Sequence, residues 1–306
     1  MLFSILIPAY KEHYLKECLQ SLSKQSFTDF EIIIVNDHSP ENLEDIVISA
    51  NDNRIHYYCN DRNYGAIDVV DNWNKCLSYA KGEYVICMGD DDCLTPECLS
   101  EYSRLIKKYP GIGALHAWTE IIDDNSQFQN ITAPRPEWES VYSLCWNRFE
   151  NRHKQFIGDW CFETEWLRSQ GGFYKLPLAW ASDDITALLC AKKNGVANTQ
   201  RICFQYRQSR YTITNTGNIT FKMEAVKKEK DWYENFLLVK PQNDIDLKYW
   251  ECIIKLLPKH IERKYAALIA EDLKKHPLHF VKWYFSRKIF GYNLQTLIMS
   301  IILSRK

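Results

Sequence analysis

The sequence predicts an α/β protein whose central sheet is mostly parallel and doubly wound. Two observations lead to this prediction. Short apolar runs rich in β-branched residues, such as Phe3–Pro8 and Glu31–Val35, alternate with helical patterns through the first 120 residues. Polar segments follow three of these runs, and the ligand crevice of such a sheet lies at the carboxyl ends of its strands.

The first half of the chain supplies most of the expected elements. Leu15, Cys18, Leu19 and Leu22 are spaced so that they share one face of a helix. Strands are expected at residues 3–8, 31–35, 54–59 and 83–88, and helices near residues 15–22, 43–47, 66–80 and 95–108.

The second half is less regular. One more strand is expected near residues 113–121, and a helix near Ser182, which would cap it while Asp183 and Asp184 occupy the positive first turn. Residues 218–306 have the pattern of successive helices, with breaks expected at Pro241, Pro258 and Pro277.

Composition excludes several classes of protein. With 46% hydrophobic residues and 38 Lys and Arg against 39 Asp and Glu, the 306-residue chain is neither disordered nor a coiled coil, and it lacks the positive charge to coat nucleic acid. The 11 cysteines contain no Cys-x-x-Cys pair and the start of the chain has no secretory signal, so we expect free thiols in the cytoplasm. No apolar run is long enough to predict a bilayer-spanning helix.

Three consecutive carboxylates, Asp90, Asp91 and Asp92, follow one of the predicted strands. Like charges at such short range raise each other's pKa unless a cation neutralises them. Clustered carboxylate oxygens suit Mn²⁺ or Mg²⁺, usually with a diphosphate completing the coordination shell. The alternative is a solvated acidic turn that caps the helix after Thr95.

An ordered set of short motifs resembles a known family across residues 3–215. The chain is similar to inverting, family 2 glycosyltransferases of the GT-A fold, which build bacterial surface polysaccharides such as O-antigen and capsule. The resemblance rests on Ser4-Ile5-Leu6-Ile7-Pro8-Ala9-Tyr10, Val35-Asn36-Asp37-His38-Ser39, Asn63-Tyr64-Gly65, Asn72-Trp73-Asn74, Ala80-Lys81-Gly82-Glu83-Tyr84, Leu94-Thr95-Pro96, Gly171-Gly172-Phe173 and Ser182-Asp183-Asp184.

The resemblance implies a pocket for a nucleotide-sugar donor, most often a UDP-sugar. Asp37 would accept a hydrogen bond from the base, although a turn-forming role before Ser39-Pro40 is an alternative. The other residues that the resemblance assigns to the donor are Pro8, Ala9, Tyr10, Glu12, Asn63, Asn74, Asp90 and Arg207. The resemblance implies that Arg207 or Arg210 holds the donor diphosphate by a bidentate contact, and a surface role is an equal alternative for this arginine.

The acidic turn departs from the family pattern, because Gly89 stands where the family has its first aspartate. The resemblance places Asp91 at the metal, with Asp90 replacing the missing ligand. Asp92 would support the metal or contact the sugar.

Asp183 and Asp184 take the place of the family's Glu-Asp pair. The resemblance implies that Asp184 is the general base that deprotonates the acceptor hydroxyl, with Asp183 assisting. A single displacement with one base inverts the anomeric carbon. The alternative is that both only stabilise the start of a helix. Gly172 and Trp180 would lie near the acceptor, although a tight turn and core packing would also explain them.

Residues 252–306 carry 11 Lys and Arg against 3 Asp and Glu, and residues 289–303 contain no charge. This pattern suits a helix lying on an anionic membrane, which would place the enzyme at the inner face of the cell membrane beside a lipid-linked acceptor. Packing against the catalytic domain or a second subunit is the alternative.

The predicted organisation is therefore a catalytic domain over residues 1–217 and a helical region over residues 218–306. A nucleotide-sugar half would span about 1–110 and an acceptor half about 111–217. A sugar nucleotidyltransferase is a rival function, but residues 8–12 lack the glycine-rich loop that it normally has. A non-catalytic nucleotide-sugar-binding protein is the third possibility, and Gly89 alone favours it.

Overall fold

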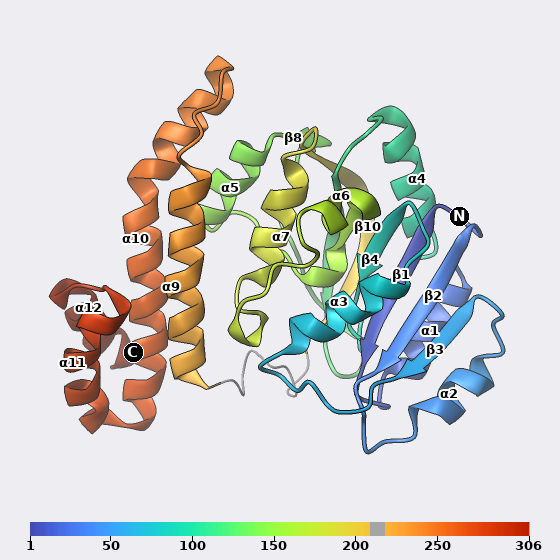
Figure 1. The fold of residues 1–306 in the computed structure, drawn as a ribbon, viewed down its shortest axis with the longest axis horizontal. Helices are drawn as coiled ribbons and strands as arrows, with labels where there is room; N and C mark the ends of the chain where they lie inside the picture. Colours follow the sequence, from blue (N-terminus) through green and yellow to red (C-terminus); the bar gives the residue numbers. More distant parts are fainter. Residues whose placement is uncertain (209–217, 306) are drawn as a thin grey trace.

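The computed structural model of the chain describes residues 1–208 and 218–305. Its centre is a ten-stranded sheet, in which eight strands follow the order β3-β2-β1-β4-β9-β6-β10-β5 and the other two are β7, beside β6, and β8, beside β10 (Figure 1). The strands are β1 (Phe3–Ala9), β2 (Phe30–Asn36), β3 (Ile55–Cys59), β4 (Tyr84–Cys87), β5 (Cys93–Leu94), β6 (Ala114–Ile122), β7 (Phe128–Ile131), β8 (Trp138–Glu139), β9 (Trp160–Glu163) and β10 (Val196–Arg207).

The two halves of the sheet differ in strand direction. β1 pairs in parallel with β2 and β4, and β2 with β3, so the carboxyl ends of these four strands lie at one edge. β9 runs antiparallel between β4 and β6, while β6 and β10 are parallel to each other. The predicted α/β class with a mostly parallel sheet and C-terminal helices is confirmed.

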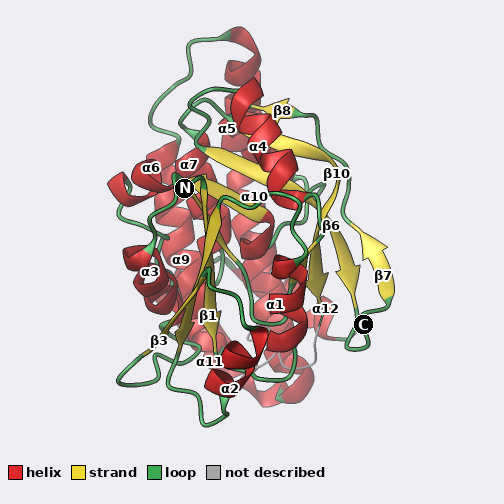
Figure 2. Ribbon diagram, turned by 90° about the vertical axis from the view of Figure 1, so that its right-hand side faces the viewer, coloured by secondary structure: helices red, strands yellow, loops and turns green. Residues whose placement is uncertain are grey.

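Helices cover both faces of this sheet (Figure 2). Apolar residues of α1 (Leu15–Ser23), α2 (Leu43–Ala50) and α4 (Cys98–Lys108) belong to the core on one face. The core on the other face takes in α3 (Val69–Tyr79), α5 (Val141–Phe149), α6 (Thr164–Ser169), α7 (Ser182–Ala191), α9 (Ile219–Phe236), α10 (Asp244–Lys275), α11 (Phe280–Phe290) and α12 (Leu294–Ser304). Three short 3₁₀ segments lie at η1 (Ile157–Asp159), η2 (Pro177–Ala179) and η3 (Pro277–His279).

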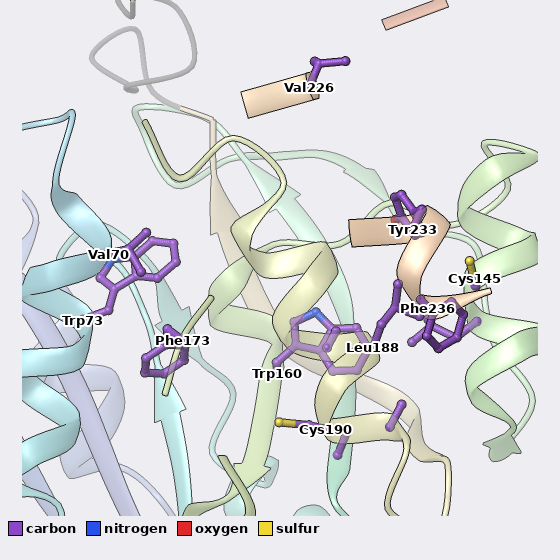
Figure 3. Packing of buried hydrophobic residues seen from close by; sticks show 14 of the residues in the cluster. Val70, Trp73, Cys145, Trp160, Phe173, Leu188, Cys190, Val226, Tyr233 and Phe236 are labelled. Carbon is purple, nitrogen blue, oxygen red and sulfur yellow. The ribbon is translucent and has the colours of Figure 1, made fainter. Parts of the chain in front are cut away.

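The second core is continuous from the sheet to the C-terminal helices. It runs from Trp73 on α3 through Trp160 on β9 to Phe236 on α9 (Figure 3). Phe149 of α5 meets Tyr233 of α9 edge to face, with ring centroids 4.8 Å apart. The C-terminal helices therefore form one side of the main hydrophobic core.

Two helix boundaries differ from the prediction. Pro258 lies inside α10 and does not end it. Ile253, Leu257 and Ile261 around it are buried, so packing outweighs the lost backbone hydrogen bond. The apolar stretch at residues 289–303 is divided, because Gly291 takes a left-handed conformation (φ 76°) between α11 and α12.

α7 begins at Ser182 as expected, but Ser182 does not cap it. Its hydroxyl instead accepts a hydrogen bond from the backbone N–H of Leu176 at 3.1 Å, and Ala181 precedes the helix in a left-handed conformation. The local turn is thus fixed by the η2 segment.

All cysteines other than Cys59 and Cys252 are buried as small apolar side chains, as expected. Within the described ranges, no helix combines the length and the apolar character needed to cross a bilayer.

Candidate functional site

Two neighbouring pockets lie beyond the carboxyl ends of β1, β2 and β4. The β1 pocket, of about 470 Å³, is lined by Pro8, Tyr10, Lys11, Asp37, Asn63, Gly65, Asn72, Asp90 and Asp91 among others. The α7 pocket, of about 700 Å³, is lined by Asp92, Arg148, Lys154, Gln155, Trp180, Asp183, Asp184, Gln208, Lys264 and Leu268 among others. Both pockets share Val69, Trp73, Ile157 and Tyr206, so the two are adjacent.

Asp37 organises one wall of the β1 pocket. Its carboxylate accepts hydrogen bonds from the Asn60 amide at 3.0 Å and from the backbone N–H groups of Tyr64 (3.0 Å) and Gly65 (3.3 Å). The Asn63 amide donates to the Asp37 carbonyl at 2.7 Å. The two predicted residues therefore hold the 60–65 loop in place and also line the pocket.

Four residues expected at the donor lie elsewhere. Ala9 is fully buried in β1 and Glu12 is exposed, and neither lines the β1 pocket. Asn74 makes two hydrogen bonds with the Phe173 backbone, at 2.8 and 3.0 Å, and a side chain on Gly172 would collide with it. Asn74 and Gly172 thus fix a turn, and neither of them lines the β1 pocket or the α7 pocket.

Arg207 is the fourth, and it is buried within the acidic turn. Its guanidinium donates to the backbone carbonyls of Asp91 (2.8 Å) and Asp123 (3.0 Å) and pairs with Glu17 at 2.9 Å. Only 1% of Arg207 is exposed, so in this structure it positions the turn, whereas the sequence led us to expect contact with the donor diphosphate. Arg210, the other arginine considered there, lies outside the described residues.

The acidic turn joins β4 to β5, and its three carboxylates have different surroundings. Asp90 accepts hydrogen bonds from the backbone N–H groups of Tyr10 (2.7 Å) and Lys11 (2.8 Å), which ties the turn to the end of β1. Asp92 accepts from the Arg207 backbone N–H at 3.0 Å. Asp91 lines the β1 pocket and has no such bond to another residue among those described.

Burial and like charge make this turn costly to ionise. Burial and the Asp91 charge raise the pKa of Asp90 to about 6, and the same two causes raise the pKa of Asp92 well above its usual range. Burial also raises the pKa of Asp91. A divalent cation would offset this repulsion, so the oxygen donors present fit such an ion.

Gly89 has a steric explanation. A Cβ at this position would lie 2.6 Å from an Asp91 carboxylate oxygen and 3.0 Å from an Asp92 oxygen. The turn therefore needs glycine in order to bring its carboxylates together. No cluster of three or more His, Cys, Asp or Glu side chains within the described part of the chain is arranged to hold a metal by itself.

The Asp183–Asp184 pair lies at the start of α7 and lines the α7 pocket. Both Asp184 oxygens accept from the Arg148 guanidinium of α5, at 2.8 and 2.9 Å, and one also accepts from the Gln155 amide at 2.7 Å. Burial raises the pKa of Asp184, but the Arg148 charge and hydrogen bonds outweigh it, so the pKa lies below its ordinary value.

Asp183 has the opposite surroundings. It forms no ion pair with any described residue, and burial together with the Asp184 charge raises its pKa to about 7. The pair therefore contains one fixed, ionised carboxylate and one carboxyl group that titrates near neutral pH.

Arg148, Gln155 and Arg135 belong to this site and escaped sequence analysis. Arg135 donates to the Gln155 side-chain carbonyl at 3.2 Å, which turns the Gln155 NH₂ group toward Asp184. Arg135 and Gln155 lie outside helices and strands, and Arg148 lies near the end of α5, in a stretch for which the sequence predicted no element. No motif marks them, and their only signal is the presence of cations and amides in that stretch.

The far wall of the α7 pocket comes from the C-terminal helices. Lys264, Ala267 and Leu268 of α10 line it, and Trp180, directly after η2, lines it too. The Lys222 ammonium of α9 lies 4.8 Å from the Trp180 ring centre. Helices outside the predicted catalytic domain thus complete this pocket.

Comparison with known proteins places the chain among sugar-transferring enzymes. Residues 4–175 match the model of glycosyl transferase family 2. An Escherichia coli protein, UDP-Glc:alpha-D-GlcNAc-diphosphoundecaprenol beta-1,3-glucosyltransferase WfgD, is 25% identical over 240 residues, covering 77% of this chain and 87% of the relative. Other curated relatives are matched over less than half of their own length.

Two solved structures share the fold. TarS 1-349 of S. aureus in complex with UDP-GlcNAc is 16% identical with a TM-score of 0.57, covering 100% of this chain and 90% of TarS 1-349. The mannosyltransferase PcManGT of Pyrobaculum calidifontis, in complex with GDP-Man and Mn²⁺, is 15% identical with a TM-score of 0.55, covering 99% and 86%. At these identities the likeness concerns the fold, and it confirms the predicted GT-A architecture.

Proposed function

Because its family match spans more than half of its length, the chain belongs to glycosyl transferase family 2, and we propose that it is an inverting enzyme that transfers a sugar from a nucleotide-diphosphate donor to a hydroxyl of a glycan acceptor. One observation carries this proposal. Two adjacent pockets meet at Val69, Trp73, Ile157 and Tyr206, and one contains the acidic turn while the other contains a carboxylate pair.

The donor would bind in the β1 pocket, with UDP as the nucleotide. Asp37 lines this pocket, and its carboxylate keeps acceptor capacity beyond the hydrogen bonds from Asn60 and the loop backbone. Uracil offers an N–H donor for such a group. The UDP-GlcNAc complex of TarS supports this choice, whereas the GDP-Man complex of PcManGT makes GDP the alternative to test.

A Mn²⁺ or Mg²⁺ ion would be held by Asp91 together with the donor diphosphate, with Asp90 and Asp92 close by. Asp91 is the best candidate because the other two carboxylates already accept backbone hydrogen bonds. Such an ion, when bound, offsets the negative charge that develops on the departing phosphate.

The α7 carboxylates would supply the general base. The sequence assigned this role to Asp184, but the surroundings favour Asp183 as the proton acceptor and Asp184 as its fixed, ionised partner. A base is most effective when its pKa lies near the working pH, and the pKa of Asp183 is about 7. Asp184 is held by Arg148 and Gln155, so accepting a proton would weaken three hydrogen bonds.

The reaction then follows from this arrangement. The acceptor hydroxyl oxygen bonds to the anomeric carbon of the donor sugar as the bond from that carbon to the diphosphate oxygen breaks. The hydroxyl proton passes to an Asp183 oxygen, and the nucleoside diphosphate leaves with the bonding electron pair. Attack and departure on opposite sides of the carbon give inversion.

The acceptor would be a lipid-linked oligosaccharide used for a surface polysaccharide such as O-antigen or capsule. Support comes from the printed activity of WfgD, which acts on a sugar diphosphoundecaprenol. Trp180 in the α7 pocket offers an aromatic face for a sugar ring. An enzyme with such an acceptor would work at the cytoplasmic face of the cell membrane.

Paired substitutions test the base. Asp183→Asn should lower kcat by about a hundredfold or more, since a general base contributes 10²–10⁴-fold, and should leave UDP binding by calorimetry unchanged. Asp184→Asn should lower activity too, but with a loss of stability on the order of 1–3 kcal/mol because the buried Arg148 loses its charged partner. Full activity of Asp183→Asn beside an inactive, stable Asp184→Asn would return the base to Asp184.

The donor is tested with a panel of UDP-, GDP- and dTDP-sugars in the presence of Mn²⁺, by following release of the nucleoside diphosphate. We expect turnover with UDP-sugars, and Asp37→Asn should weaken their binding. A preference for GDP- or dTDP-sugars would contradict the assignment of Asp37 to uracil.

A further inference from the structure

α11 presents a continuous apolar stripe to solvent. Val281, Phe285 and Ile289 follow one another at intervals of four residues, which places them on one face of the helix. They are 59%, 71% and 64% exposed, and Leu278 of η3 extends the stripe. Trp283, on the opposite side of the helix, is fully buried and donates to Asp272 of α10 at 2.7 Å.

α12 repeats this arrangement. Leu294, Ile298 and Ile302 are also spaced by four, and each is about half exposed. Leu297 and Ser300 on the other side of the helix are buried against the rest of the protein. We call these exposed side chains the α11–α12 face: Leu278, Val281, Phe285, Ile289, Leu294, Ile298 and Ile302.

The segment that carries this face is strongly basic. The 34 residues after Asp272 contain seven Lys and Arg and no Asp or Glu. Among the described residues, Lys282, Arg287 and Lys288 form no ion pair with a carboxylate. Lys282 and Lys288 lie three residues before and after Phe285, so their exposed charges flank the apolar stripe. Arg287 lies on the other side of the helix, over the ring of Tyr284 at 4.2 Å.

This face lies toward the end of the molecule that contains the pockets. In Figures 1 and 2, which share their vertical axis, α11 lies at the lower end, and the carboxyl ends of β1 and β2 point toward the same end. The α7 pocket adjoins this region, because Ala267 and Leu268 in the last third of α10 line it.

We infer that the α11–α12 face docks on an anionic lipid surface. Apolar side chains flanked by uncompensated cations are the pattern of an interfacial helix, in which the apolar side enters the acyl boundary and the cations meet the headgroups. A partner surface of protein would have to be rich in carboxylates to satisfy the same cations. That docking delivers the acceptor rests on the proposed function, whereas lipid binding itself does not.

Vesicle sedimentation of the full chain tests the inference. The probe is vesicles of phosphatidylcholine alone or mixed with phosphatidylglycerol. We expect binding to the mixed vesicles, weaker binding to neutral ones, and weaker binding at higher salt. The variant Val281→Ser/Phe285→Ser/Ile289→Ser should lower the partition coefficient at least about tenfold, because three apolar side chains lose their transfer free energy.

A matched control separates docking from general stickiness. Leu238→Ser/Val239→Ser changes two apolar residues that are 79% and 71% exposed, in the connection between α9 and α10 at the opposite end of the molecule. This variant should bind vesicles like the unaltered protein. Lys288→Glu should lower binding to the anionic vesicles alone.

Two outcomes overturn the inference. One is absence of binding to anionic vesicles by the unaltered protein. The other is a dimer in analytical ultracentrifugation that the α11 variant abolishes while vesicle binding stays unchanged, since a second copy would then cover the face. The experiment also separates a failure of this inference from a failure of the proposed function. Asp183→Asn, which removes the proposed base, should bind vesicles normally. The α11 variant should keep full transfer activity toward a water-soluble acceptor assayed without detergent.

Discussion

The pH dependence of transfer should follow the protonation of the Asp183 carboxyl group. Burial and the neighbouring Asp184 charge raise its pKa to about 7, so below that pH it is mostly protonated and cannot accept the acceptor's proton. We expect kcat to fall about tenfold per pH unit on the acidic side of pH 7 and to level off above it.

The variant Asp184→Asn checks the cause of that acidic limb. It removes the like charge that raises the Asp183 pKa and frees the Arg148 cation, and both changes lower that pKa. The acidic limb of the residual activity should therefore move to lower pH. A limb that stays in place or moves to higher pH would contradict the role given to Asp183.

Gln155 should affect catalysis because its amide is oriented to donate a hydrogen bond to Asp184. Arg135 binds its carbonyl and so directs its NH₂ group to Asp184 at 2.7 Å. In Gln155→Glu that contact becomes one between two carboxylates, so we expect Asp184 to shift and kcat to fall about tenfold to a hundredfold.

Gln205→Glu is the matched control for this substitution. Gln205 also donates to a carboxylate, that of Glu120 at 3.1 Å, but neither residue lines the α7 pocket. Its like-charge penalty should appear in the melting temperature and leave kcat unchanged. Equal losses of kcat in both variants would show that the effect of Gln155 is general destabilisation.

At this scale the sequence identifies residues that directly follow predicted strands and the two aspartates in the first turn of α7. Asp37, Asp90 and Asp91 line the β1 pocket, as the strand-end argument predicts, and Asp183 and Asp184, which the helix start and the family resemblance singled out, line the α7 pocket. Arg148 escapes it because its partner Asp184 is 36 residues away and no periodicity joins them. Arg207 was expected at the donor but is buried beside the acidic turn, because the residue type alone does not show whether an arginine is buried.

The geometry of the acidic turn depends on the absence of a side chain at Gly89. In Gly89→Ala the new Cβ would meet the Asp91 carboxylate at 2.6 Å, and because that carboxylate ends a short side chain it can rotate away. We expect a melting temperature close to the original but a several-fold or larger loss of Mn²⁺-dependent donor binding, measured by calorimetry.

Gly82→Ala provides the contrast. There the new Cβ would lie 2.5 Å from backbone atoms of Phe3 and Ser4, which cannot rotate away, so stability should fall by about 1–3 kcal/mol. Gly89→Ala thus tests a clash with the carboxylates of the acidic turn, and Gly82→Ala tests a clash with the backbone of β1. Loss of stability without loss of donor binding in Gly89→Ala would contradict the explanation.

The predictability of elements follows their pattern of burial. β1 and β2 are buried on both faces, so their apolar runs identify them. β10 escapes detection because Asn198, Thr199 and Gln200 interrupt its apolar pattern. Asn198 is nevertheless buried, and its amide donates to the Pro136 carbonyl at 2.8 Å, a partner that only the folded chain provides.

At the scale of the whole molecule, the sequence pattern changes near residue 217, but one hydrophobic core extends across this expected boundary. Trp160 and Leu188 belong to the same hydrophobic cluster as Tyr233 and Ile253 of the C-terminal helices. Lys264 and Leu268 also complete the α7 pocket. We therefore propose that residues 218–305 stabilise the catalytic part as well as extending it, and that the chain unfolds as one cooperative unit.

Two adjacent isoleucines of α10 test this cooperativity. Ile253 is fully buried in the shared core, so Ile253→Ala should lower the free energy of unfolding by about 2–5 kcal/mol. Ile254 is 41% exposed, and Ile254→Ala should change it by no more than about 0.5 kcal/mol. Both values come from denaturant titration followed by tryptophan fluorescence and by circular dichroism.

If the core is shared, Ile253→Ala moves one common transition in both signals, because the tryptophans of the sheet side and the helices of the C-terminal part lose their packing together. Two separated transitions, of which Ile253→Ala moves only one, would mean that the C-terminal helices form an independent domain.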